Sequence, residues 1–214
     1  MVGRFVFHHG HYFPSVLNDF DAISSSYDIL VRLVFGDKLW QATNYFLKDI
    51  DPNASVLILG GGTGRILDAF KGQTITYVEK SNKMLVRARA KTSANVIFIH
   101  EDFMEWNTVE TYDVVICPFF LDVFDSENLM KATEKISQYL SIRGTLIVTD
   151  FQQTGRRKHE LLLWIMHAFF YVVTHLESNR LQDIKGALKH TGLIPVNERT
   201  WYKGFIFSTR FKKP

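Results

Sequence analysis

The chain has 214 residues, a length that suits one domain with a lid and is ample for a hydrophobic core. Its hydrophobic fraction is 46%, and its formal net charge of +3 is too mild to indicate a nucleic-acid or membrane partner by itself. The single cysteine, Cys117, excludes a disulfide framework and a thiolate metal cluster, and it fits a reducing compartment.

The sequence predicts no targeting segment. The apolar stretch at residues 5–7 is far shorter than the apolar core of a secretory signal. The most apolar window, residues 161–176, is interrupted by polar side chains and falls short of the ~20 residues that a membrane-spanning helix needs. We therefore expect a cytoplasmic globular protein.

Residues 1–50 are predicted to form an N-terminal arm and a helical lid. Apolar side chains recur at helical spacing in residues 27–35 and again in residues 37–47. Gly36 lies between these two runs, where a glycine commonly ends a helix. Three histidines in the arm lack the spacing of a zinc site, so no metal is predicted: His8, His9 and His11.

From Asp51 onward, short β-rich runs alternate with helical runs. Five strands are predicted, at residues 55–59, 74–79, 95–100, 112–117 and 144–150. Helices are predicted between them at residues 65–70, 82–90 and 127–140, the last two capped by Ser81 and by Asp125 or Ser126. Continuous apolar runs suit strands buried on both faces, and the intervening helices indicate right-handed crossovers. The pattern is typical of a doubly wound α/β domain with a parallel sheet.

The C-terminal third departs from this alternation. An apolar helical insert is predicted at about residues 156–178, followed by a helix at residues 180–190. The last two runs, residues 193–198 and 205–211, are predicted to pair as a hairpin and give the sheet an antiparallel edge strand. The apolar insert has three interpretations, which are a core helix under the lid, a homodimer contact and a transient lipid contact.

A glycine-rich loop follows the first predicted strand and opens a helix. It reads Gly60-Gly61-Gly62-Thr63-Gly64, and glycines there let the backbone pass close to a ligand. The spacing fits neither a hydride-transfer fingerprint, because Arg65 stands where the third glycine belongs, nor a Walker loop. The alternative is an ordinary tight β–α turn.

Carboxylates follow the second and third predicted strands. Glu79 can accept hydrogen bonds from both hydroxyls of a ribose, as in dinucleotide folds. Asp102 is placed to accept from an adenine amino group, with Phe103 offering a backbone donor and an apolar wall. A solvated glutamate and a helix-capping aspartate are the alternatives for these two acids.

The ordered set of glycine loop, Glu79 and Asp102 resembles the class I S-adenosylmethionine-dependent methyltransferases. Residues 56–64 resemble the family's first motif, and residues 78–85 its acidic motif. Residues 20–28 resemble the entry helix of the branch that methylates carbon in ubiquinone and menaquinone biosynthesis.

This resemblance implies a Rossmann-like seven-stranded sheet in the order 3-2-1-4-5-7-6, mostly parallel with an antiparallel terminal strand, beneath an N-terminal helical lid. It implies that residues 51–214 bind S-adenosylmethionine and release S-adenosylhomocysteine. The cofactor-binding residues that it implies are Tyr27, Gly60, Gly61, Gly62, Gly64, Glu79, Lys80, Met84, Asp102, Phe103 and Pro118.

Two positions depart from the family pattern. Ile58 replaces the usual acid two residues before the first glycine, and Arg65 replaces an acid that quinone methyltransferases often have after the last glycine. These departures keep open a second hypothesis, a methyltransferase-like protein that binds a ligand or partner without catalysis.

The best candidate for a catalytic base is Asp122, four residues after Pro118, where this fold binds substrate beyond the strand ends. A helix-capping or solvated aspartate is the alternative. The 30 aromatic residues divide as ten in residues 1–50, ten in residues 51–150 and ten in residues 151–214, so the flanks are enriched. We therefore expect an apolar or aromatic small-molecule acceptor. A nucleic-acid substrate is not expected, because residues 117–120 carry no N-P-P-Y or D-P-P-Y motif.

Overall fold

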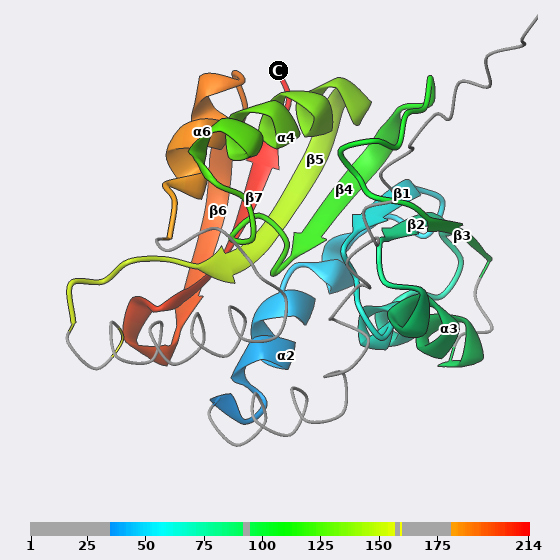
Figure 1. Cartoon of the computed structure of the whole chain (residues 1–214), viewed down its shortest axis with the longest axis horizontal. Coiled ribbons are helices and arrows are strands. Elements are labelled where there is room, and N and C mark those ends of the chain that lie inside the picture. Colours follow the sequence, from blue (N-terminus) through cyan, green and yellow to red (C-terminus); the bar gives the residue numbers. More distant parts are fainter. Residues whose placement is uncertain (1–34, 92–94, 157–158, 160–180) are drawn as a thin grey trace, which may run out of the picture.

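The computed structural model describes residues 35–91, 95–156, 159 and 181–214, and their strands form one seven-stranded sheet (Figure 1). The strands are β1 (Ser55–Leu59), β2 (Thr74–Glu79), β3 (Val96–His100), β4 (Tyr112–Pro118), β5 (Leu140–Phe151), β6 (Ile194–Trp201) and β7 (Ile206–Lys212). Their order is β3-β2-β1-β4-β5-β7-β6, with β7 antiparallel to both of its neighbours and all other pairs parallel. The predicted sheet order and the antiparallel terminal strand are confirmed.

Helices cover both faces of the sheet (Figure 1). The α-helices are α2 (Lys38–Asn44), α3 (Asn82–Lys91), α4 (Ser126–Tyr139) and α6 (Ile184–His190), and the 3-10 turns are η1 (Leu47–Asp49), η2 (Arg65–Ala69) and η3 (Tyr202–Gly204). Helices α4 and α6 pack on one face, where they meet the side chains of Leu57 and Cys117. On the other face, α3 and η2 meet Ile58 and Tyr77. Both faces of the central strands are therefore buried, which explains their continuous apolar runs.

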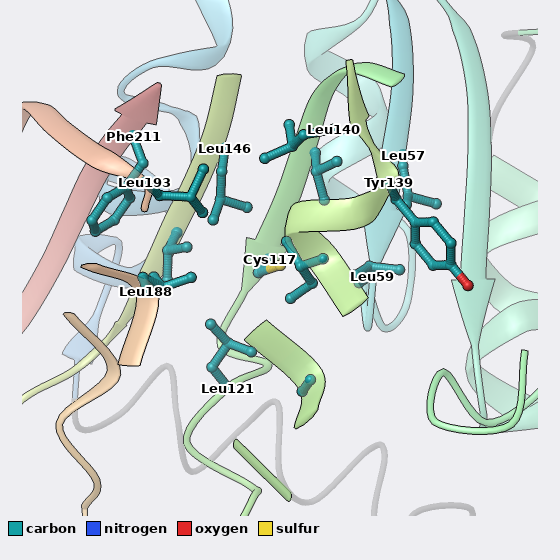
Figure 2. Packing of buried hydrophobic residues seen from close by; sticks show 14 of the residues in the cluster. Leu57, Leu59, Cys117, Leu121, Tyr139, Leu140, Leu146, Leu188, Leu193 and Phe211 are labelled. Carbon is teal, nitrogen blue, oxygen red and sulfur yellow. The ribbon is translucent and has the colours of Figure 1, made fainter. Parts of the chain in front are cut away.

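The core beneath α4 and α6 is closely packed (Figure 2). Cys117 lies among leucines contributed by neighbouring elements, and it is fully buried. Burial raises the pKa of its thiol well above the ordinary value, since a thiolate would lose its hydration. Cys117 therefore packs as a small hydrophobic side chain in this core.

Helix ends follow local hydrogen bonds. Asp125 caps α4 as predicted, its side chain accepting from the Asn128 N–H at 2.8 Å, and Ser81 Oγ accepts from the Met84 N–H at 3.3 Å at the start of α3. The predicted start at residue 180 is wrong, because α6 begins at Ile184 after a cap by Asp183.

Two other predicted helices are also shorter than expected. The helix predicted at residues 65–70 is only the 3-10 turn η2. It follows Gly64, whose backbone is in the left-handed region, and no side chain caps its start. The one predicted at residues 37–47 ends at Asn44 and continues as the turn η1.

Strand β6 forms one edge of the sheet, and its side chains are largely exposed. The register with β7 shifts between Pro195 and Asn197. Glu198 pairs with Lys185 of α6 at 2.6 Å, and Arg199 lies over the Tyr45 ring at 5.7 Å. Charged side chains thus join the edge strand to α6 and to Tyr45, the residue that follows α2.

Two predicted segments lie outside the described residues, namely most of the N-terminal arm and lid and most of the apolar insert at about residues 156–178. Within the described part of the chain, no helix combines the length and apolar character of a membrane span.

Candidate functional site

The glycine loop leaves β1 at the carboxyl edge of the parallel strands. Gly60, Gly62 and Gly64 all have positive φ angles, of 65°, 63° and 76°, which side chains other than glycine rarely adopt. At Gly64 a Cβ atom would also lie 2.6 Å from the Ala88 Cβ of α3. The loop therefore needs glycine both for its turns and for its close approach to the helix.

Tyr77 of β2 packs against this loop. Its side chain is fully buried, and its hydroxyl donates to the Gly62 carbonyl oxygen at 3.0 Å. A Cβ atom at Gly61 would collide with the Tyr77 ring. Burial raises the Tyr77 pKa well above the ordinary value, and the nearby negative charge of Glu79 adds a smaller rise. The hydroxyl therefore stays protonated and can donate. The sequence interpretation missed Tyr77, although its place two residues before Glu79 could have drawn attention to it.

Replacing Tyr77 by phenylalanine removes the hydrogen bond and leaves the Gly62 carbonyl without this partner. We expect the free energy of unfolding to fall by about 0.5–1.5 kcal/mol, the usual net value of one hydrogen bond. Urea denaturation of the two proteins measures the change. Tyr139→Phe is a matched control, because that hydroxyl donates to the Trp106 carbonyl at 3.3 Å away from the loop. A loss of thermal protection by bound S-adenosylhomocysteine in Tyr77→Phe alone would assign Tyr77 to the loop.

Glu79 ends β2 beside the loop. One carboxylate oxygen accepts from the Gly62 N–H at 3.0 Å and the other from the Ser81 N–H at 2.9 Å. Burial raises the Glu79 pKa, and these backbone hydrogen bonds oppose the rise. The acid that the sequence places at a ribose is thus in direct contact with the glycine loop.

Asp102 lies beyond β3 and forms an ion pair with Lys80 at 2.8 Å. Its other carboxylate oxygen accepts from the Met104 N–H at 2.9 Å. Burial raises the Asp102 pKa, but the hydrogen bond and charge of Lys80 outweigh burial, and the net direction is down. Asp102 is therefore ionised at neutral pH and already engaged by Lys80.

The other predicted binding residues lie in different parts of the structure. Met84 lies in the first turn of α3, and its sulfur is 3.6 Å from where a Cβ atom on Gly62 would stand. Pro118 ends β4. The Phe103 ring is buried in the core beneath α4, 5.6 Å from the Phe120 ring. Tyr27 lies outside the described residues, and its contact with a cofactor stays a prediction.

The turn that follows β4 lies beside the glycine loop. Phe119 has a positive φ of 52°, which a bulky side chain rarely adopts. The Phe120 ring covers Gly60, where a Cβ atom would lie 2.5 Å from the ring. The turn that carries Asp122 therefore lies directly against the glycine loop.

Asp150, at the carboxyl end of β5, holds this turn. Its side chain is fully buried, and one oxygen accepts from the N–H groups of Leu121 and Asp122 at 3.0 and 3.3 Å, while the other accepts from the Phe151 N–H at 2.8 Å. Burial raises the pKa of Asp122 to about 6. Burial and the Asp122 charge raise the pKa of Asp150 as well, against its three backbone hydrogen bonds. The sequence interpretation placed Asp150 in the fifth strand and gave it no role in the site.

The two departures from the motif pattern have clear positions. Ile58 is fully buried in the core shared with α3 and pairs in register with Tyr77. The guanidinium of Arg65 lies over the Trp40 ring at 4.5 Å and links the glycine loop to α2. An acid at position 58 would face apolar neighbours, so its absence fits the local packing.

Two other features bear on alternative sites. A cavity of about 430 Å³ lies at the opposite, amino edge of the sheet, lined by the amino end of β4 and the residues before β1. Its acidic and basic side chains include the ion pair between Asp49 and Arg210 at 2.9 Å, and none of the predicted site residues lines it. In the described ranges, no group of three or more potential metal ligands occurs.

The comparisons with known proteins agree with this geometry. Residues 56–144 match a family described as a methyltransferase domain. The chain is 29% identical over 147 residues to the ubiquinone/menaquinone biosynthesis C-methyltransferase UbiE of Hydrogenovibrio crunogenus, covering 63% of this chain and 57% of that protein. The chain thus spans little more than half the length of this curated relative.

Solved structures share the fold at low identity. A chain from the complex between the Haloferax volcanii Trm112 methyltransferase activator and a methyltransferase has a TM-score of 0.70 at 16% identity, over 94% of this chain and 100% of that one. The N-methyltransferase NodS of Bradyrhizobium japonicum, solved with S-adenosylhomocysteine, has a TM-score of 0.67 at 15% identity, over 92% and 99%. The domain match at residues 56–144, the sheet order and the glycine loop are thus similar to those of class I S-adenosylmethionine-dependent methyltransferases.

Proposed function

We propose that this protein transfers a methyl group from S-adenosylmethionine to an apolar or aromatic small molecule. The observation that carries the proposal is the contact between Glu79 and the glycine loop at the Gly62 N–H. Bound there, a nucleoside would present its ribose hydroxyls to a carboxylate and its attached groups to backbone glycines. The UbiE relative, named as a C-methyltransferase, and NodS, solved with S-adenosylhomocysteine, support the same cofactor.

The acceptor class rests on the surroundings of the loop. Phe120 covers Gly60, and the rings of Phe119, Phe120 and Phe124 in the segment after β4 are only partly buried. Such walls suit a flat or greasy molecule better than a highly charged one. S-adenosylmethionine, when bound, supplies the methyl group and keeps the electron pair of the broken carbon–sulfur bond. The chain's own part is to align the acceptor within about 3–3.5 Å of the methyl carbon and to exclude water.

Isothermal calorimetry with S-adenosylhomocysteine tests the cofactor. Binding in the micromolar range is expected, and no heat at high micromolar concentrations would remove the proposal. Incubation with methyl-labelled S-adenosylmethionine and fractionated cell extract tests the reaction, and we expect the label in the organic-soluble fraction.

A second candidate function is a binding protein of the same fold. Ile58 favours it, because an apolar core residue stands where the family usually has an acid. Binding of S-adenosylhomocysteine without label transfer to any fraction would support this candidate over the enzyme.

A further inference from the structure

The Asp150 carboxylate is a fully buried acid at the carboxyl edge of the sheet, beside the proposed site. Within the described part of the chain, it accepts three hydrogen bonds, all from backbone N–H groups, and two of these belong to the turn after β4. A buried carboxylate is costly unless such partners compensate it. This aspartate therefore has a structural task, and the task is to fix the turn of Leu121 and Asp122.

The same turn lies against the cofactor loop. Phe120, the residue before Leu121, covers Gly60. The Asp122 backbone is held by Asp150 on one side, while its own side chain is partly exposed. Asp122 is thus a carboxylate on a fixed turn, two residues after the Phe120 ring that covers Gly60.

We propose that Asp150 is a positioning residue that holds Asp122 beside the glycine loop, so that Asp122 accepts the proton of an acceptor carrying an O–H or N–H group. This inference rests on the proposed function and deepens it. In the step, the acceptor's proton passes to the Asp122 carboxylate as the acceptor's electron pair forms the bond to the methyl carbon. The methyl carbon's bond to sulfur breaks, and its electron pair stays on sulfur.

The surroundings of the pair suit this task. Among the described residues, the titratable groups that face Asp150 are Asp122 from the turn and Cys117 from β4, while β7 pairs Asp150 with the apolar Phe207. No cation of the described chain therefore offsets the two carboxylates. A base that titrates near neutral pH can take a proton and return it to water.

The first experiment needs no acceptor. Carboxyl ¹³C NMR of the full chain follows the titration of Asp122, and amide hydrogen exchange follows the N–H groups of Leu121 and Asp122. In Asp150→Ala we expect the Asp122 midpoint to fall from about 6 toward the ordinary range of an aspartate as the turn opens, and these two amides to exchange about tenfold faster. Asp150→Asn, which keeps an amide oxygen as acceptor, should lie between the wild type and Asp150→Ala.

Asp113→Ala is the matched control, because Asp113 also accepts a backbone N–H, from Ser55 at 3.0 Å, at the opposite edge of the sheet. It should leave both signals unchanged. An ordinary Asp122 midpoint in the wild type, or an unchanged midpoint and exchange in a folded Asp150→Ala protein, would overturn the inference. If Asp150→Ala does not fold, Asp150→Asn decides by the same two signals.

The second experiment tests the proton transfer. Asp122→Asn should reduce label transfer to the acceptor fraction by at least a hundredfold, with affinity for S-adenosylhomocysteine within threefold of the wild type. Undiminished transfer would show that Asp122 is no base. Absence of S-adenosylhomocysteine binding in the wild type would instead remove the proposed function, so the two failures are distinguishable.

Discussion

Replacing Gly64 with alanine is expected to lower the free energy of unfolding by about 2–5 kcal/mol. The left-handed conformation, at φ of 76°, costs an alanine about 1–2 kcal/mol. The new Cβ would also stand 2.6 Å from the Ala88 Cβ and 2.7 Å from its Cα, and crowding of this kind in a packed core costs about 1–3 kcal/mol. Backbone of α3 cannot move aside as a flexible side chain would.

Gly192→Ala separates the two costs. Gly192 also has a positive φ, of 85°, but its Cβ would meet nothing within 4 Å. The free energy of unfolding of Gly192→Ala should therefore fall by about 1–2 kcal/mol, which is the conformational cost alone. Urea denaturation of both variants measures the difference. Equal losses in the two variants would show that Ala88 does not crowd the loop, and partial recovery in Gly64→Ala with Ala88→Gly would show that it does.

Replacing Glu79 with glutamine is expected to weaken binding of S-adenosylhomocysteine by about tenfold to a hundredfold. A carboxylate accepts from two ribose hydroxyls with charge-assisted hydrogen bonds of about 1.5–3 kcal/mol each, whereas an amide has one acceptor oxygen and no charge. Isothermal calorimetry gives the dissociation constants directly. Glu101→Gln is a matched control, since Glu101 is exposed and lies next to Asp102.

The same substitution should not destabilise the free protein to a comparable extent. Burial raises the Glu79 pKa, so the folded state favours the neutral form of this side chain. A neutral amide avoids that desolvation and keeps one acceptor for the Gly62 or Ser81 N–H. We therefore expect weaker binding at nearly unchanged stability near pH 8. Unchanged affinity would mean that the ribose binds elsewhere.

The sheet could be predicted closely where single strands are buried on both sides. Strands β1 and β2 have the bounds that their apolar runs predict, because each run is closed by a polar or glycine-rich turn. Strand β5 is longer than the predicted residues 144–150, since Leu140 already pairs with Tyr112 as soon as α4 ends. A helix that passes directly into a strand leaves no loop residues to mark the change.

The residues of the candidate site could be picked out from the sequence by their motifs, whereas the contacts between the motifs could not. Gly62 and Glu79 stand out in the sequence because glycine and a strand-end acid have characteristic chemistry. Tyr77 donates a hydrogen bond to the loop, and Asp150 accepts one from the turn, so each bond joins segments that are distant in the sequence. Both residues are of common types. Only the fold brings these partners together.

Among the residues that the structure describes, β6 pairs only with β7, so its outer edge carries backbone groups that another strand could pair with. An exposed edge of unpaired backbone groups is a template for aggregation. Pro195 has no N–H to donate, and the register shift beside it breaks the regular spacing of the ladder. Glu198 and Arg199 add charge of both signs along the same edge. The features that make β6 irregular thus limit growth of the sheet beyond seven strands.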